Sequence, residues 1–527
     1  MADTVTPARP SVLVVSGGTA CNEILDAFTS GLFERCCFVL PVSDNGGSSS
    51  EIIRVLGGPS LGDIRSRLVR LIPDTPDKAG IKALFGYRLP SSGDVDGMRV
   101  KQEWLEIVEG KHPLWRNIPP DRREAIRAFL VHFEHAILRR AQRQFDFRSG
   151  SVGNFWLAGA QLFVRSLQSA IFLFSCVCGG SSNHSVVPAI NTNSLVTVAA
   201  ELEDGSRIVG QNEISHPSQD SAANEMLPGS YTPASTSWSD HDSRTGPSSR
   251  SRNDSMKHLQ LPYADLRSAN DDKPKAHSGL HCALTPSLAR AVSTELDDDD
   301  DELSVIARTK FDLEHQQDVD EGEQSCSTNP MDWPSTRQGN ILFSKSEDGT
   351  WVSLPAKIKK IIYLNTYGQA TFPAPSSAFL SGLENSDVLV YSCGSLFTSL
   401  IPPLALSGIG STIAMSQNLR MKVLLLNATF DRESEDLTAV DFINTITDHL
   451  NGSIGRPHVP HNRQAPRHMP NRFSPSDYIT HLVYLEKGCI PIDERRLEQM
   501  KISCHRIPSS RFDDRNLREL LASMLSQ

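Results

Sequence analysis

Short apolar runs alternate with stretches of helical periodicity along most of the chain. The runs are continuous, and turn or polar residues follow each of them, at residues 12–15, 38–40, 361–364, 388–391, 423–426 and 482–485. Continuous apolar runs are typical of strands that are covered on both faces of a sheet. We therefore predict that these six runs form buried parallel strands.

Helical patterns lie between many of the runs, for example over residues 125–142 and 438–450. Strands that alternate with helices form right-handed βαβ units, which build a sheet with helices on both faces. The predicted fold class is α/β, with a Rossmann-like, doubly wound and mainly parallel sheet.

Residues 217–340 interrupt this pattern. The segment is rich in Ser, Asp, Asn and Pro, and it carries 11 Lys and Arg against 22 Asp and Glu, whereas the rest of the chain has 41 against 40. A segment of this composition buries too little apolar surface to offset its ordering entropy. We expect a long disordered acidic insert here.

The insert divides the chain into three parts. Residues 11–216 and 341–527 share the same strand and helix pattern, so we predict that they are two parts of one α/β domain. Long surface insertions add little closure entropy. Residues 217–340 are therefore expected to lie outside the fold.

Composition excludes several classes of protein. The near-neutral remainder lacks the basic field that nucleic-acid binding requires. The longest apolar stretch, 170–177, is too short to span a membrane, and residues 1–7 lack the pattern of a secretory signal. The ten cysteines include no C-x-x-C pair, so we expect reduced thiols and no structural zinc. A cytoplasmic protein is predicted.

Glycines and small hydroxyl residues follow three of the predicted strands. At the first strand end, Gly17, Gly18 and Thr19 precede a helix predicted at 22–28. Glycines let a backbone approach a ligand closely, and helix starts favour anions. The alternative is a plain strand-to-helix turn. The segment matches neither the dinucleotide fingerprint nor a P-loop, which argues against both of those sites.

The second strand end has the sequence Asp44, Asn45, Gly46, Gly47, Ser48. Ser48 and Glu51 have the spacing of a capping box, which predicts a helix start. A carboxylate directly after a strand, such as Asp44, is suited to binding metal or accepting a proton. The alternative for Asp44 is an Asx turn that stabilises the loop.

Two more segments complete the candidate site. Asp63 is either a helix N-cap or a metal-binding carboxylate, and Arg65 pairs either with phosphate or with Asp63. The third strand end carries Gly394, Ser395 and Thr398. Because the carboxyl ends of parallel strands meet at one edge of a sheet, we expect these groups to form one ligand site.

These motifs resemble the CofD-like superfamily, which contains 2-phospho-L-lactate transferase and the bacterial gluconeogenesis factor (YvcK) family. The segments that carry the resemblance are 17–19, 43–49, 62–65, 151–155, 188–191, 200–205, 394–402, Asn427 and 438–441. Segments 103–110 and 212–216 resemble a eukaryotic branch of the superfamily.

The resemblance implies a phosphate-bearing ligand and leaves two functions open. In the transferase branch, a phospholactyl group moves from a guanosine diphosphate carrier to a deazaflavin hydroxyl with Mg²⁺. In the gluconeogenesis-factor branch, a uridine diphospho-sugar is bound, which fits a sensor. The usual Asp-Asp-Gly-Gly of the superfamily is Asp44-Asn45-Gly46-Gly47 here, which removes one charge from a magnesium site. A nicotinamide oxidoreductase would need a glycine fingerprint that the sequence lacks.

The candidate residues fall into two groups. The catalytic and Mg²⁺-binding candidates are Asp44 and Asp63. The candidate ligand- and phosphate-binding residues are Gly17, Gly18, Thr19, Asn45, Gly46, Gly47, Ser48, Arg65, Asn154, Gly394, Ser395 and Thr398. The expected partners are a nucleotide diphosphate or nucleotide sugar, a second copy of the chain, and a protein that docks on the acidic insert. Nucleic acid and membranes are not expected.

Overall fold

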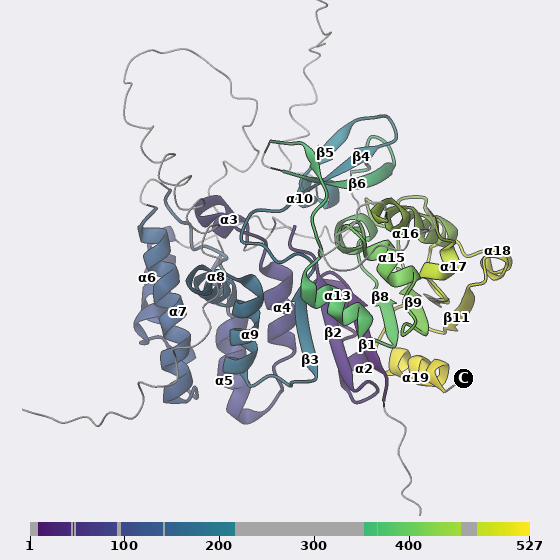
Figure 1. Ribbon diagram of the computed structural model, residues 1–527. Coiled ribbons are helices and arrows are strands. Elements are labelled where there is room, and N and C mark those ends of the chain that lie inside the picture. The colour runs from purple at the N-terminus through teal and green to yellow at the C-terminus, as the bar shows by residue number, and fades with distance from the viewer. Residues whose placement is uncertain are drawn as a thin grey trace, which may run out of the picture. The chain divides into compact units, whose positions relative to one another are not determined.

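The computed structural model describes residues 9–43, 46, 49–91, 96–140, 143–216, 352–365, 367–454 and 472–526. Within these residues the strands form two sheets, and helices lie beside both (Figure 1). The predicted insert, residues 217–340, lies outside the described residues.

The larger sheet has seven strands, all of them parallel. In spatial order they are β11 (Ser503–Ile507), β10 (His481–Leu485), β9 (Met421–Leu425), β8 (Val388–Tyr391), β1 (Ser11–Val15), β2 (Arg35–Leu40) and β3 (His184–Pro188). Every residue of β1, β8 and β9 is buried, as expected for strands covered on both faces. The predicted doubly wound, parallel α/β fold is confirmed.

The smaller sheet is antiparallel. Its strands in order are β5 (Arg207–Val209), β4 (Thr197–Leu202), β6 (Ile358–Leu364) and β7 (Ala370–Thr371). The prediction that 361–364 forms a parallel strand was wrong, because this run lies in β6 and pairs antiparallel with β4. A short apolar run indicates burial, but it does not encode the direction of pairing.

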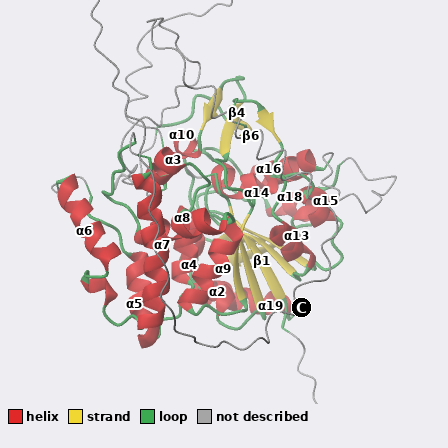
Figure 2. Ribbon diagram, turned by 60° about the vertical axis from the view of Figure 1, so that its left-hand side comes forward, coloured by secondary structure: helices red, strands yellow, loops and turns green. Residues whose placement is uncertain are grey.

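Helices lie on both sides of the larger sheet (Figure 2). The first half of the chain contains α1 (Thr19–Asn22), α2 (Asp26–Thr29), α3 (Ser50–Leu56), α4 (Gly62–Arg70), α5 (Pro76–Gly86), α6 (Gly97–Glu109), the 3₁₀ turn η1 (Pro113–Trp115), α7 (Pro120–Leu138), α8 (Val152–Val164), α9 (Leu167–Cys178) and α10 (Gln211–Ser215). The second half contains α13 (Ser377–Glu384), the π-helical turn η3 (Leu396–Leu400), α14 (Ile401–Leu404), α15 (Ile409–Ala414), α16 (Ala439–Ser453), α17 (Pro475–Tyr478), α18 (Glu494–Gln499) and α19 (Asp514–Leu525).

Aromatic side chains form much of the core between α6, α7 and α8. Trp104, Phe133 and Phe155 are fully buried and contact one another, with the Phe133 and Phe155 rings stacked at 4.7 Å. The indole N–H of Trp104 donates to Glu134 at 2.6 Å, so its polar group is satisfied. This packing gives α8 a fixed position, which matters because its first turn belongs to the candidate site.

The larger sheet draws its strands from both sides of the undescribed segment. Strands β1, β2 and β3 precede residue 217, whereas β8, β9, β10 and β11 follow residue 351, and β1 pairs directly with β8. The described residues of both parts therefore share one sheet. No helix in the described ranges is long and apolar enough to cross a membrane.

Candidate functional site

The larger sheet reverses its winding direction between β1 and β8. The order runs from β1 through β2 to β3 on one side and from β8 through β9 and β10 to β11 on the other. In open α/β sheets, ligands bind beyond the carboxyl ends of the strands at such a switch point. We call residues 16–19 and 392–399, which follow β1 and β8, the switch-point edge.

The turn after β1 allows two side chains to approach its backbone closely. A Cβ on Gly18 would lie 2.1 Å from Asp63 Oδ1, and a Cβ on Gly17 would lie 2.5 Å from Ser399 Oγ. Such distances exclude any larger residue unless its neighbours move. Thr19 begins α1 and is exposed. The two glycines thus bring a carboxylate and a hydroxyl against the same turn.

A buried arginine lies beneath this turn. Arg67 donates through Nη2 to the Gly17 carbonyl at 3.1 Å and to Ser16 Oγ at 3.3 Å, and through Nε to Asn22 Oδ1 at 2.6 Å. Its guanidinium also lies 4.9 Å from the centre of the Phe38 ring. These partners are all neutral, so the positive charge of Arg67 favours an anion at the turn above it.

Asp63 lies in the first turn of α4. The N-cap of α4 is Leu61, so the alternative in which Asp63 caps the helix was wrong. The α4 dipole stabilises a carboxylate at this position. Within the described ranges, no group of three or more His, Cys, Asp or Glu side chains is placed to hold a metal ion. Asp44, the other candidate metal ligand, lies outside the described residues.

Arg65 reaches from α4 to the first turn of α8. Its Nε donates to Asn154 Oδ1 at 3.1 Å, and its Cδ packs so closely that a Cβ on Gly153 would lie 2.9 Å away. Burial, and then the charge of Arg88, lower the pKa of Arg65 to about 10, while Asp63 acts in the opposite direction. Arg65 therefore remains charged at neutral pH and is held beside Asn154, another of the predicted ligand residues.

The loop after β2 contacts α10. Ser43 Oγ donates to Gln211 Oε1 at 3.3 Å, and a Cβ on Gly46 would lie 2.4 Å from Asn212 Oδ1. Gly46 therefore permits the close approach of Asn212. Other candidates of this loop, Asp44, Asn45, Gly47 and Ser48, lie outside the described residues, and their roles remain predictions.

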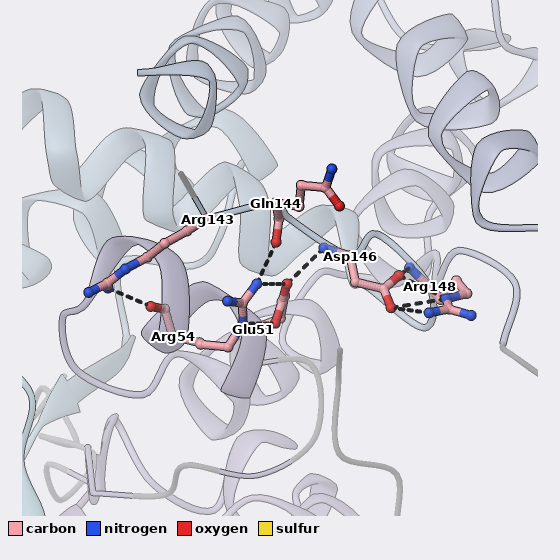
Figure 3. A network of polar contacts seen from close by, with 6 residues as sticks. All are labelled: Glu51, Arg54, Arg143, Gln144, Asp146 and Arg148. Atoms are coloured by element: carbon pink, nitrogen blue, oxygen red, sulfur yellow. Dashed lines mark hydrogen bonds and ion pairs between the residues drawn. The ribbon is translucent and has the colours of Figure 1, made fainter. Parts of the chain in front are cut away.

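Helix α3 begins one residue later than predicted. Its N-cap is Ser49, whose side chain makes no capping hydrogen bond. Ser48 lies outside the described residues, so its predicted capping box with Glu51 stays a prediction. Glu51 is fully buried and accepts two hydrogen bonds from Arg54, both at 2.7 Å, and one from the Asp146 N–H at 2.7 Å (Figure 3). Hydrogen bonds between charged groups, such as those from Arg54, are stronger than neutral ones.

This network joins α3 to the segment that leads into α8 (Figure 3). Arg54 donates to the Gln144 carbonyl at 2.5 Å, and Arg143 donates back to the Arg54 carbonyl at 2.9 Å. Arg148 forms a bidentate pair with Asp146, with its shorter bond at 2.6 Å. The network therefore holds the end of the β2 loop and the start of α8 in a fixed relation.

The strand end after β8 is held from the neighbouring strand. The Gly394 N–H donates to Asn427 Oδ1, and Asn427 Nδ2 donates to the Gly394 carbonyl, both at 2.8 Å. Gly394 has a φ of 139°, which side chains disfavour. Ser395 is the N-cap of η3 and makes no side-chain cap bond. The backbone at this strand end is thus fixed by Asn427.

A buried carboxylate occupies the start of η3. Glu433 accepts hydrogen bonds from the Phe397 and Thr398 N–H groups at 3.0 Å, and from the Thr398 and Ser215 hydroxyls at 2.5 Å. Burial, and then the Asp431 carboxylate, raise the pKa of Glu433 to about 7, although the bonds from Ser215 and Thr398 oppose this shift. Thr398 thus has a protein partner where the sequence predicted a ligand contact.

The preceding residue anchors both chain segments that flank the undescribed region. Arg432 Nη1 donates to the carbonyls of Glu213 and Ile214 at 2.6 and 3.0 Å, and its Nε donates to the Val352 carbonyl at 2.7 Å. Arg432 and Glu433 therefore tie α10 and residue 352 to the switch-point edge.

Several buried polar groups around the switch-point edge have no hydrogen-bond partner among the described residues. They are Ser49 Oγ, Ser60 Oγ, Ser151 Oγ, Asn212 Nδ2 and Ser392 Oγ. Buried polar groups are nearly always paired in folded proteins, because leaving one unpaired carries a desolvation penalty. Their position in the strand-end loops and at the starts of α8 and α10 fits a polar ligand.

The sequence interpretation missed four residues of this region: Arg67, Arg88, Asn212 and Glu433. Charged residues on helices and in polar turns usually face solvent, so Arg67 and Glu433 resemble surface residues. One feature of the sequence could have indicated Arg67, because it lies two residues after the candidate residue Arg65 in the same helix.

The fold and the site together define a doubly wound α/β protein of the CofD-like type. The family model described as "2-phospho-L-lactate transferase CofD" matches residues 12–505, a range that begins in β1 and ends in β11. The chain belongs to this family, and the predicted resemblance is confirmed.

Relatives extend over both parts of the chain. The uncharacterized protein YNL011C of Saccharomyces cerevisiae is 33% identical over 523 residues, which cover 98% of this chain and 99% of the relative. The gluconeogenesis factor of Halalkalibacterium halodurans is 34% identical over 126 residues, which cover 23% of this chain and 38% of that protein. The crystal structure of a UPF0052 family member from Bacillus halodurans aligns over 99% of this chain and 100% of its own, with a TM-score of 0.50 and 14% identity, and shows a shared fold.

Proposed function

We propose that the chain binds a nucleotide-diphosphate ligand at the switch-point edge. The buried guanidinium of Arg67 carries this proposal, because it lies directly beneath the Gly17 turn and its partners there are neutral. A fixed positive charge in a low-dielectric position attracts phosphate more strongly than an exposed one. The position at a sheet switch point supports the same assignment.

The remaining groups suit the other parts of such a ligand. Arg65 presents a second charge at the start of α8, and Asn212 and Ser392 have buried polar atoms that lack partners within the described structure. Donors and hydroxyls of this kind recognise sugar hydroxyls and base edges. We assign phosphate binding to Arg67 and the β1 turn, and recognition of the nucleoside or sugar to the polar groups.

We include Mg²⁺ in the proposal. The half-buried Asp63 carboxylate against the Gly18 backbone is a suitable donor, since Mg²⁺ in proteins is commonly held by one or two carboxylates and by substrate phosphates. Asp44 would be the second carboxylate. When bound, Mg²⁺ would neutralise charge on the diphosphate.

A transferase is the first of two candidate activities. The family model that matches the chain is that of a transferase. In this reaction the chain would hold a nucleotide-diphosphate ester. The acceptor hydroxyl oxygen would form a bond to the phosphorus that carries the transferred group, the phosphoanhydride bond would break, and the nucleoside monophosphate would leave. Asp44 or Asp63 would accept the hydroxyl proton, and Arg67 would stabilise charge on the phosphate.

A non-catalytic sensor of a nucleotide sugar is the second candidate. Asn45 stands where the superfamily usually has a second aspartate, and Asn brings no negative charge to a metal. Several relatives of the chain are gluconeogenesis factors. In this role, the switch-point edge would bind its ligand without turnover and would signal to a protein partner.

A thermal-shift panel tests the binding proposal. Guanosine and uridine diphosphates, uridine diphospho-sugars and dinucleotides are each added with and without Mg²⁺. A ligand at about 100 times its Kd should stabilise the protein by about 2.7 kcal/mol. Stabilisation by a nucleotide diphosphate or a diphospho-sugar supports the proposal. A panel in which dinucleotides alone raise the melting temperature would contradict it.

A further inference from the structure

Beside the switch-point edge, the start of α8 has the features of an anion site. Helix α8 has 13 residues, and its N-cap is Ser151. The Ser151 side chain is fully buried, makes no cap hydrogen bond, and has no partner among the described residues. An N-cap serine normally satisfies one of the free N–H groups of the first turn. Here both the hydroxyl and the helix dipole remain available to another group.

Two arginines accompany this helix start. Arg65 is 8% exposed, and its Nε is held by the neutral amide of Asn154 in the first turn. Arg88 pairs with Ser151 through a backbone bridge, and its exposed side chain donates through Nη1 to the neutral carbonyl of Ser149 at 3.4 Å. The positive charge of Arg88 also acts on Arg65, since it contributes to lowering the pKa of the Arg65 guanidinium. We call Arg65, Arg88, Ser151 and Asn154 the α8 cluster.

A purely structural role accounts poorly for the α8 cluster. Two neighbouring guanidinium groups repel each other, and the positive end of a helix dipole adds to this repulsion, which the Asp63 carboxylate near Arg65 offsets in part. A structural arrangement would let Ser151 cap the helix and would give Arg65 a carboxylate at Nε. The structure instead pairs that Nε with an amide and leaves the Ser151 hydroxyl unpaired.

We propose that the α8 cluster binds a second anionic group, an oxyanion of the phosphate or carboxylate class, separate from the diphosphate at the β1 turn. A planar guanidinium, a hydroxyl donor and the positive end of a helix dipole together suit a tetrahedral or planar oxyanion. The second anion belongs to the group attached to the diphosphate or to a second substrate. This assignment of the anion to a ligand rests on the proposed function, whereas the site itself rests on the α8 cluster alone.

The test uses inorganic phosphate and acetate as probes on the full-length protein. Each probe is titrated in a thermal-shift assay at constant ionic strength, with and without a saturating guanosine or uridine diphosphate. The variants are Arg88→Gln, which removes one long hydrogen bond to the Ser149 carbonyl, and Ser151→Ala, which removes no hydrogen bond among the described residues. Arg495→Gln on α18 is the matched control, because this arginine is exposed on a helix that contacts β11, at the other edge of the sheet.

One of the two probes should stabilise the protein even when the nucleotide is saturating. Arg88→Gln should weaken the affinity for that probe about fivefold, whereas Arg495→Gln should bind it as tightly as the wild type does. Preference for phosphate or for acetate identifies the class of the anion. Competition between probe and nucleotide, equal probe binding in all variants, or no effect of either probe would overturn the inference. A protein that no nucleotide stabilises, but that binds phosphate in an Arg88-dependent manner, would retain the α8 site and lose the proposed function.

Discussion

The carboxylate of Asp63 lies against the backbone of Gly18, with Oδ1 2.1 Å from the position that a Cβ on Gly18 would take. This contact joins the first turn of α4 to the turn after β1. Gly18→Ala should therefore destabilise the protein by about 2 kcal/mol through overpacking, as measured by urea unfolding. Gly452→Ala, where a Cβ would meet nothing within 4 Å, serves as the control and should not destabilise it.

A double-mutant cycle isolates the contact. Asp63→Gly should relieve the effect of Gly18→Ala, with a coupling free energy of at least about 1 kcal/mol. Additive effects of the two substitutions would show that the Gly18 requirement comes from elsewhere in the turn.

Glu433 should make stability depend on pH. Its pKa is raised from 4.5 to about 7, so the folded protein holds this proton to a higher pH than the unfolded chain does. The resulting stabilisation is complete below pH 4.5 and is lost as the pH rises to about 7, by up to about 3 kcal/mol. The measurement is urea unfolding at pH 5 and pH 7.5.

Glu433→Gln should remove this contribution, so that the wild-type protein loses stability relative to the variant as the pH rises. Glu519→Gln on the exposed face of α19 is the control and should follow the wild type. Parallel pH profiles for wild type and Glu433→Gln would show that Glu433 stays ionised in the folded protein.

Asp63 should control the magnesium dependence of nucleotide binding. In Asp63→Asn, nucleotide affinity should no longer respond to Mg²⁺, and affinity without metal should be equal or higher, because a carboxylate that repels phosphate has been removed. Isothermal titration with and without Mg²⁺ measures both quantities. An Mg²⁺ response of wild-type size in the variant would remove Asp63 from the metal site.

Asp44→Asn separates the two candidate activities. A transferase should lose turnover together with the Mg²⁺ dependence of binding, whereas a sensor should keep its metal-independent affinity. Turnover undiminished in the variant would exclude Asp44 as a catalytic group.

Residues 217–340 should be dispensable for folding and for nucleotide binding. Arg432 holds the carbonyls of Ile214 and Val352 with one guanidinium, so the chain ends on either side lie close together and a short Gly/Ser linker can join them. The melting temperature and the nucleotide affinity of this variant should match those of the full chain. An insoluble or non-binding product would contradict the prediction.

The sequence was sufficient to predict the fold where burial alone decided the structure. Strands such as β1 and β8 are apolar at nearly every position because both faces are covered, and that pattern is local. The direction of β6 depends on its partner β4, which is far away in the chain, so the apolar run at 361–364 did not reveal it.

Prediction of the site was limited in a similar way. The glycines at 17, 18 and 46 indicated where the strands end. They did not show why glycine stands at these positions, which is that Ser399, Asp63 and Asn212 approach the backbone from distant segments. Buried charges were the main omission. Arg67 and Glu433 are buried because tertiary partners satisfy them, and no local pattern records those partners.

Hydrogen–deuterium exchange with and without a nucleotide diphosphate or diphospho-sugar tests most directly whether the ligand binds at the switch-point edge. Binding at the switch-point edge should slow exchange in peptides that cover residues 16–22 and 392–400, and should leave exchange unchanged in α19, which lies against α2 and β11. Protection confined to other segments, or an exchange pattern that no nucleotide alters, would contradict the proposed site.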